Sequence, residues 1–181
     1  MAQQEHENGR ESDQDNLTQL DRVNKGAALT DKIFSLVGRS QFFAEFSRED
    51  ISILMGYVDV YRAQSGRLII REGDSGNFML LVIEGAVDIL KRGIRSELYM
   101  TSAGPGMTLG EMSMIDGEPR FATCVATQPT VFAVLTRDTM AQIILDQPSL
   151  GSKILVKLVT MLSLRLRQTS VRLLKYMERS R

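Results

Sequence analysis

The sequence contains a single histidine and a single cysteine among its 181 residues. The histidine, His6, lies in a polar N-terminal stretch that has little apolar content to fold it back onto a domain. A Ser-His-Asp or Cys-His catalytic arrangement is therefore not expected. A metal site built from imidazoles or from paired cysteines is not expected either. These absences favour a binding protein over an enzyme.

The cysteine, Cys124, has no second cysteine with which to form a disulfide within the chain, and this favours a reducing compartment. The N-terminus is polar and lacks the apolar region of a secretory signal. No apolar run approaches the length of a membrane span. We therefore expect a cytoplasmic protein that does not enter a membrane. We also expect a bacterial source, which these features do not themselves establish.

The formal net charge is zero, but the charges are unevenly distributed along the chain. Residues 1–31 contain seven acidic and three basic residues, whereas residues 150–181 contain eight basic and one acidic residue. A run of like charges is most often a solvated face. The sequence therefore predicts an acidic tail and a basic terminal helix, and neither predicts nucleic-acid binding by itself.

Hydrophobic periodicity divides the chain into three parts. Residues 1–28 are rich in Gln, Glu, Asp and Asn and are predicted to form a disordered acidic tail. Residues 29–147 begin with helices, one of them starting at Ser47 with Asp50 three residues later, and continue with about eight short strands separated by glycines. Residues 148–181 form a predicted long helix that begins at Pro148.

This order of elements predicts an α+β fold. Many short strands with Gly-rich turns are typical of a barrel or a sandwich. We expect an eight-stranded β-roll or jelly roll with N-terminal helices and a long C-terminal helix.

The predicted terminal helix carries apolar residues at steps of four and three, which form a heptad seam with one polar member: Leu155, Val159, Leu162, Leu166, Thr169, Leu173 and Tyr176. Such a seam is typical of a two-stranded coiled coil. Alternatively, the seam packs on the barrel of its own chain. Because the stripe is longer than one small barrel can cover, we favour a homodimer formed through this helix.

The stretch Leu109-Gly-Glu-Met-Ser-Met-Ile-Asp-Gly-Glu-Pro-Arg-Phe-Ala-Thr123 carries groups suited to a sugar phosphate. Gly110 allows close backbone approach, and the one-turn helix expected after it offers free N–H groups to an anion. Glu111 can accept hydrogen bonds from sugar hydroxyls. The planar guanidinium of Arg120 matches phosphate oxygens. Each feature is common alone, and the spacing is what makes the combination specific.

This stretch resembles the phosphate-binding cassette of cyclic nucleotide-binding domains, the regulatory module of the catabolite activator protein, protein kinase A regulatory subunits and gated channels. The resemblance extends upstream to Leu68-Ile-Ile-Arg-Glu-Gly-Asp-Ser-Gly-Asn-Phe-Met-Leu-Leu-Val-Ile-Glu-Gly-Ala-Val-Asp-Ile89 and covers about residues 42–177. It implies the fold of that family. It also implies a cyclic nucleotide, cyclic AMP first, as the ligand, with no further cofactor.

The resemblance assigns roles to residues of the cassette. Glu111 would hold the ribose 2′-hydroxyl, and Arg120 would hold the cyclic phosphate. The backbone N–H groups of Met112 and Ala122 would help to bind the phosphate, and Gly110 would begin the one-turn helix.

Four further residues are candidates for contact with the base. Thr169 and Ser170 match a Thr-Ser pair that, in the catabolite activator, meets the adenine across the dimer. Alternatively, Thr169 only sets the register of the helix pair. Met100 and Thr101, on the strand before the cassette, would line the base pocket unless they are plain strand residues.

One residue departs from the family pattern. Phe121 follows the cassette arginine, where the family usually has Ala, Ser or Thr. One interpretation is that the Phe121 ring packs against the purine. The other is that the ring fills the pocket, so that the site has lost or changed its ligand.

The first functional hypothesis is a cyclic nucleotide sensor that signals through its terminal helix to an unidentified downstream protein. The second is a dimeric adaptor with a vestigial pocket, and the third is a receptor for another anionic ligand such as cyclic di-GMP. Transcription factors of the family carry a helix-turn-helix domain after the long helix, whereas this chain stops at Arg181. Direct DNA binding is therefore not expected, and neither is catalysis.

Overall fold

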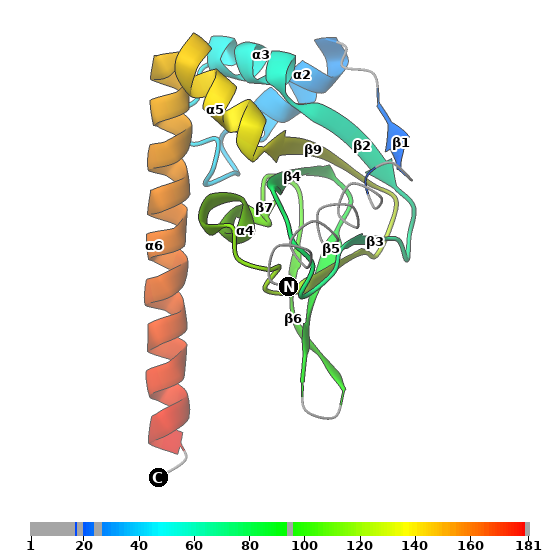
Figure 1. Ribbon diagram of the computed structural model, residues 1–181, viewed down its shortest axis with the longest axis vertical. Helices are drawn as coiled ribbons and strands as arrows, with labels where there is room; N and C mark the ends of the chain where they lie inside the picture. The colour runs from blue at the N-terminus through cyan, green and yellow to red at the C-terminus, as the bar shows by residue number, and fades with distance from the viewer. Residues whose placement is uncertain (1–16, 18–19, 24–26, 94–95, 180–181) are drawn as a thin grey trace, which may run out of the picture.

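A computed structural model describes residues 17, 20–23, 27–93 and 96–179 (Figure 1). In chain order its elements are β1 (Asp21–Arg22), α2 (Ala27–Ser35), α3 (Arg48–Tyr57), β2 (Asp59–Ala63), β3 (Leu68–Ile70), β4 (Phe78–Glu84), β5 (Val87–Arg92), β6 (Glu97–Ala103), β7 (Thr108–Leu109), α4 (Glu111–Asp116), β8 (Thr123–Ala126), β9 (Thr130–Thr136), α5 (Arg137–Asp146) and α6 (Pro148–Arg179).

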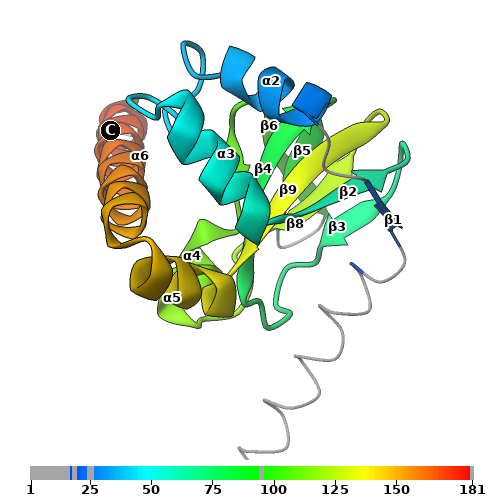
Figure 2. The same ribbon diagram turned by 90° about the horizontal axis from the view of Figure 1, so that it is seen from above.

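The strands form two antiparallel sheets, with the orders β1-β2-β9-β4-β7 and β3-β8-β5-β6. Helices α2, α3 and α5 gather at one end of the roll, and α6 runs from that end past its side (Figures 1 and 2). The predicted fold class is therefore confirmed. Two strands of only two residues, β1 and β7, were not predicted, because so short a segment has no readable alternation.

The predicted disordered tail lies mostly outside the described residues. Where residues 1–28 are described, they differ from the prediction: Asp21–Arg22 pairs with β2, and α2 already begins at Ala27. The N–H of Val23 donates to the carbonyl of Val60 at 2.8 Å and extends this pairing. An exposed sheet edge offers such bonds to any extended segment beside it.

Strand β4 separates two apolar cores by simple alternation. Phe78, Leu80 and Val82 point into the roll between the two sheets, where Phe132 of β9 joins them. The alternate residues of β4 point to the other core, which lies under helices α2, α3, α5 and α6. The N-terminus of α3 has the capping box expected from the sequence, because Ser47 and Asp50 each bond the other's backbone N–H. The helices are therefore fixed to the back of the same sheet whose front lines the roll.

The first half of α6 packs on its own domain through one face. Ile154, Leu158 and Met161 are buried in the core beneath the helices. Two ion pairs join the same half to the N-terminal layer, Lys153 to Asp50 at 2.5 Å and Lys157 to Glu45 at 2.8 Å. Beyond Arg165 every described residue of α6 is exposed. No helix within the described ranges is both long enough and apolar enough to cross a membrane.

The packing of one face of α6 predicts how substitutions in this helix change the free energy of unfolding. Replacing buried Ile154 with Ala is expected to lower the free energy of unfolding by about 2–5 kcal/mol, because a cavity remains beneath the helix. Val156→Ala removes an exposed side chain from the same helix and is expected to change it by less than about 0.5 kcal/mol. Urea unfolding followed by circular dichroism measures both. Equal losses would contradict this packing of α6.

Candidate functional site

The cassette lies between β7 and β8, where the chain makes one short helix. Gly110 precedes α4 with φ at 79°, and Gly117 ends it with φ at 80°. Both values lie in the left-handed region that a side chain disfavours. The two glycines therefore set where the predicted one-turn helix begins and ends, and they place Glu111 on its first turn.

Arg120 lies inside the roll, with only 2% of its surface exposed. Its Nη1 donates to the carbonyl oxygens of Phe78 at 2.7 Å and Gly110 at 3.0 Å, and the guanidinium lies 4.3 Å from the centre of the Phe78 ring. Its backbone N–H donates to the carbonyl of Asp74 at 2.8 Å. A buried cation needs such partners. These contacts hold the guanidinium inside the roll, beside the cassette.

Two glycines make room for the guanidinium. A Cβ at Gly76 would lie 1.9 Å from Arg120 Nε, and one at Gly110 would lie 2.7 Å from Nη1. Gly110 was predicted as a site residue, but Gly76 was not. The only signal for Gly76 was its place in the upstream stretch that carries the family resemblance. Its role depends on a contact between two distant loops, which a single sequence does not reveal.

Glu111 is also 2% exposed, and it connects the cassette to α6. Its Oε1 accepts a hydrogen bond from Nη1 of Arg165, while Nη2 of the same guanidinium donates to the carbonyl of Thr108 at 3.0 Å. Burial lowers the pKa of Arg165. The sequence did not predict Arg165 as a site residue, although it lies one helical turn before Thr169 on the same helix.

The second oxygen of Glu111, Oε2, is buried and has no hydrogen-bond partner within the described residues. The same holds for the hydroxyl of Thr108. Buried polar atoms normally have a partner, and a lone one is costly. The cassette therefore presents an acceptor beside α6 that is suited to a hydroxyl donor.

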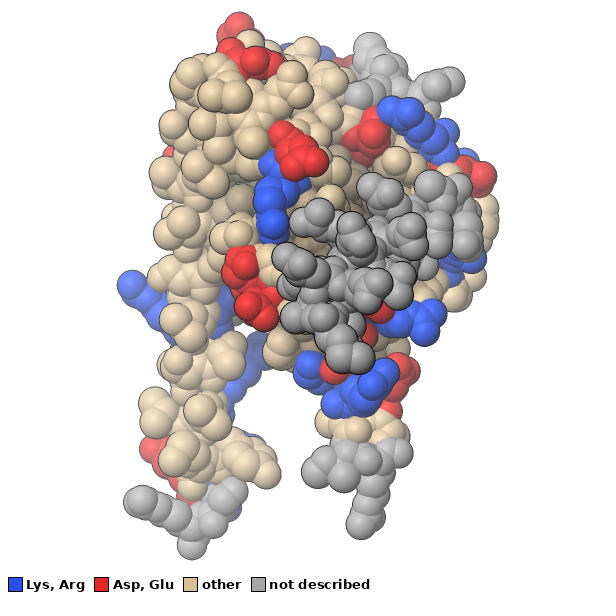
Figure 3. Space-filling view, viewed as in Figure 1, with Lys and Arg blue, Asp and Glu red and all other residues tan. Residues whose placement is uncertain are grey.

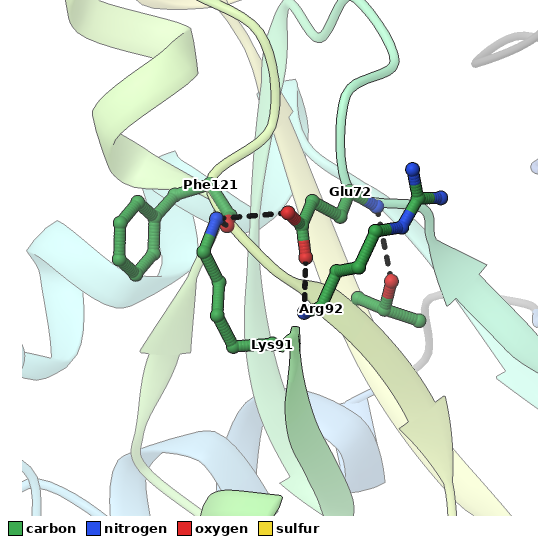
Figure 4. Close-up of polar contacts among 5 residues, drawn as sticks. Glu72, Lys91, Arg92 and Phe121 are labelled. Atoms are coloured by element: carbon green, nitrogen blue, oxygen red, sulfur yellow. Dashed lines mark hydrogen bonds and ion pairs between the residues drawn. The ribbon is translucent and has the colours of Figure 1, made fainter. Parts of the chain in front are cut away.

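Phe121 does not fill the interior of the roll, since 51% of its surface is exposed. Its ring lies against the ammonium of Lys91 on β5, with Nζ 4.3 Å from the ring centre (Figure 4). The same Nζ donates to the carbonyl of Phe121 at 2.6 Å. The interpretation in which the ring blocks the pocket from within is therefore not supported.

The remaining predicted site residues lie on several different elements. Ala122 is buried beside Phe121, whereas Met112 on α4 is half exposed. Met100 and Thr101 lie on exposed positions of β6. Thr169 and Ser170 lie on the exposed half of α6, where Ser170 Oγ donates to the carbonyl of Leu166 at 2.9 Å. Among the predicted site residues, Gly110 and Arg120 are in direct contact, and the roles of the four base-contact candidates stay predictions.

The surface around the cassette carries both basic and acidic side chains, and Asp116 and Glu118 of the cassette itself are exposed. In Figure 3 the molecule is hollowed between the lower half of α6 and the β5–β6 hairpin, and blue Lys and Arg side chains border the upper part of this hollow on both sides. The basic side chains at the border of this hollow favour an anion there. In the part of the chain that the structure describes, no group of three or more His, Cys, Asp or Glu residues is arranged to hold a metal ion. The arrangement suits the binding of a sugar phosphate.

Comparison with solved structures finds the same fold in proteins of known type. A cyclic nucleotide-binding domain from Methylobacillus flagellatus is 35% identical, with a TM-score of 0.78, and the match covers 88% of this chain and 90% of that one. The catabolite activator protein of Thermus thermophilus is 27% identical, with a TM-score of 0.68 over 74% of this chain and 62% of that one.

Comparison of sequences agrees. A cAMP-dependent protein kinase regulatory subunit from Yarrowia lipolytica is 32% identical over 68% of this chain and 32% of its own length. The chain spans 24–32% of the length of this and two further kinase regulatory subunits that it matches. The family model for the cyclic nucleotide-binding domain matches residues 60–147. With the near full-length match to the Methylobacillus domain, these findings show that the chain belongs to the cyclic nucleotide-binding domain family.

Proposed function

We propose that the protein is a sensor that binds a cyclic nucleotide, cyclic AMP first, between the cassette and α6. The family is regulatory rather than catalytic, and we assign no reaction to the site. The observation that carries the proposal is the pair of buried, oppositely charged side chains next to Gly110, with Glu111 Oε2 lacking a partner within the described residues. A ribose cyclic phosphate has a hydroxyl that can donate to the carboxylate of Glu111 and a negative charge that can pair with the guanidinium of Arg120.

In the proposed complex the cyclic phosphate lies against Arg120 and accepts hydrogen bonds from the backbone N–H groups of Met112 and Ala122. The ribose 2′-hydroxyl donates to Glu111. Charge-assisted bonds of these kinds are the strong ones. The similarity to the cAMP-dependent protein kinase regulatory subunit of Yarrowia lipolytica supports cyclic AMP as the first ligand to test.

We propose that the signal passes to α6 through Glu111, because one oxygen of this carboxylate already accepts from Arg165 of that helix. A ligand hydroxyl that donates to the other oxygen would join the ligand to α6 through this one buried carboxylate. Thr169 and Ser170 lie one turn further along α6, where closure of the helix would bring them to the base. Met100 and Thr101 would approach the base from the hairpin. Such closure would shift the equilibrium between an open and a closed position of α6.

Exposure of the seam on α6 supports a homodimer. Val159, Leu166 and Leu173 are exposed in the single chain, while the neighbouring stripe of α6 packs on the domain. Exposed apolar side chains on a long helix favour pairing with a second copy. We further propose a cytoplasmic location, which the lone buried Cys124 supports, and an unidentified downstream protein. Direct binding to DNA or to a membrane is not part of the proposal.

The ligand proposal predicts the effect of removing the cassette arginine. Arg120→Ala is expected to weaken cyclic AMP binding at least tenfold, since charge-assisted hydrogen bonds to the phosphate are lost. Titration calorimetry with cyclic AMP, cyclic GMP and cyclic di-GMP measures this. Arg62→Ala, which removes an exposed arginine from β2, is the matched control and is expected to bind as the wild type does.

Because Arg120 is buried, its loss can also disturb folding, and Glu111→Gln provides a second variant of nearly the same shape. It is expected to weaken binding while the protein stays folded. If the wild-type protein binds only cyclic di-GMP, the ligand assignment is wrong. If it binds none of the three, the protein is better explained as an adaptor with a vestigial pocket.

The dimer proposal predicts a difference between two leucines of α6. Leu166→Glu places a charge on the seam and is expected to shift the protein to a monomer. Leu164→Glu places the same charge off the seam and is expected to leave the dimer intact. The two side chains are 69% and 37% exposed in the single chain, so neither change disturbs a core. Sedimentation equilibrium measures both, and a monomeric wild type at high concentration would refute the dimer.

A further inference from the structure

We propose that Lys91 is a positioning residue of the nucleotide site, which orients the Phe121–Ala122 peptide so that the Ala122 N–H points to the ligand phosphate. The inference rests on the proposed function and adds a residue of β5 to it. It starts from the direct bond between Lys91 Nζ and the Phe121 carbonyl, which at 2.6 Å is short for such a contact.

The geometry of a peptide bond transmits this contact. The C=O of Phe121 and the N–H of Ala122 belong to one planar unit, and no cis peptide occurs in the described chain. In a trans peptide these two groups point in opposite directions. By holding the carbonyl oxygen on the β5 side, Lys91 turns the Ala122 N–H to the other side.

Lys91 is itself fixed by two other contacts. Its Nζ forms an ion pair with Glu72 Oε1 at 2.9 Å, and it lies over the Phe121 ring (Figure 4). The other oxygen of Glu72 accepts the backbone N–H of Arg92 at 2.7 Å, and the N–H of Glu72 donates to Thr123 Oγ1 at 3.1 Å. These hydrogen bonds, from the Arg92 N–H first and then from Lys91, hold the pKa of Glu72 below its ordinary value. The ammonium is therefore anchored from the β3–β4 turn and from β5.

The residue before the peptide is anchored as well. The carbonyl of Arg120 accepts the N–H of Gly73 at 2.9 Å, and its N–H donates to Asp74 at 2.8 Å. The 72–74 turn thus holds the Arg120 backbone directly and the Phe121 carbonyl through Glu72 and Lys91. A donor that is already aimed costs less to order when the ligand arrives. A cation on the carbonyl also polarises the same peptide toward stronger donation.

The test uses two ligands, cyclic AMP and ribose 3′,5′-cyclic phosphate, which lacks the base. Lys91→Met keeps the aliphatic stem but loses the ammonium, and it is expected to weaken the binding of both ligands by about the same factor, about fivefold to tenfold. Lys32→Met removes an exposed, ion-paired lysine of α2 and is the matched control, expected to leave both affinities unchanged. Unchanged affinities in Lys91→Met, or a loss confined to cyclic AMP, would overturn the inference.

A second variant separates the carbonyl from the ring. In the Phe121→Ala background the carbonyl remains, so Lys91→Met is expected to retain most of its effect. Disappearance of that effect would assign Lys91 to the ring alone and refute the proposal.

A measurement without ligand distinguishes failure of this inference from failure of the proposed function. In protein labelled with ¹⁵N-alanine, Lys91→Met is expected to move the Ala122 amide resonance, while Lys32→Met leaves it in place. An unmoved resonance overturns the inference whatever the ligand. If the wild type binds neither ligand, the proposed function fails, and the resonance still decides whether Lys91 orients the peptide.

Discussion

The buried carboxylate of Glu111 connects the cassette to α6. One of its oxygens accepts from Arg165 of α6, and the other has no partner within the described residues. A buried charge is tolerated only where it is paired, so the guanidinium of Arg165 and the position of α6 depend on each other. A group that binds the second oxygen would contact a carboxylate that also holds this helix of 32 residues, and our proposal that a ligand signals through α6 rests on this contact.

The buried guanidinium of Arg120 supplies a positive charge to the site, opposite in sign to that of Glu111. Arg120 is held by backbone carbonyls and an aromatic ring, and glycines at 76 and 110 leave the space it occupies. The turn after β3 fixes its backbone, and Lys91 fixes the peptide that follows it. Glu111 thus contacts α6 through Arg165, and Arg120 contacts β4 through Phe78. In the proposed complex, the hydroxyl and the anionic group of one ligand would contact both.

Sequence patterns predicted the parts of this arrangement that are local. The capping box of Ser47 and Asp50, the short helix after Gly110 and the start of the long helix at Pro148 each follow from a few neighbouring residues, and each is found. The contact of Glu111 with Arg165 and that of Lys91 with Phe121 join segments 54 and 30 residues apart, and only the folded chain brings them together. Gly76 and Thr108 were missed for the same reason. The family resemblance identified the cassette but not the residues of β5 and α6 that support it.

Hydrogen–deuterium exchange of α6, with and without saturating cyclic AMP, tests the coupling most directly. The described half of the helix beyond Arg165 is exposed, so its amides report any closure over the ligand. We predict slower exchange from Arg165 onward when cyclic AMP is bound, and loss of this protection in Arg165→Ala. Binding of cyclic AMP with no change in the exchange of α6 would contradict it.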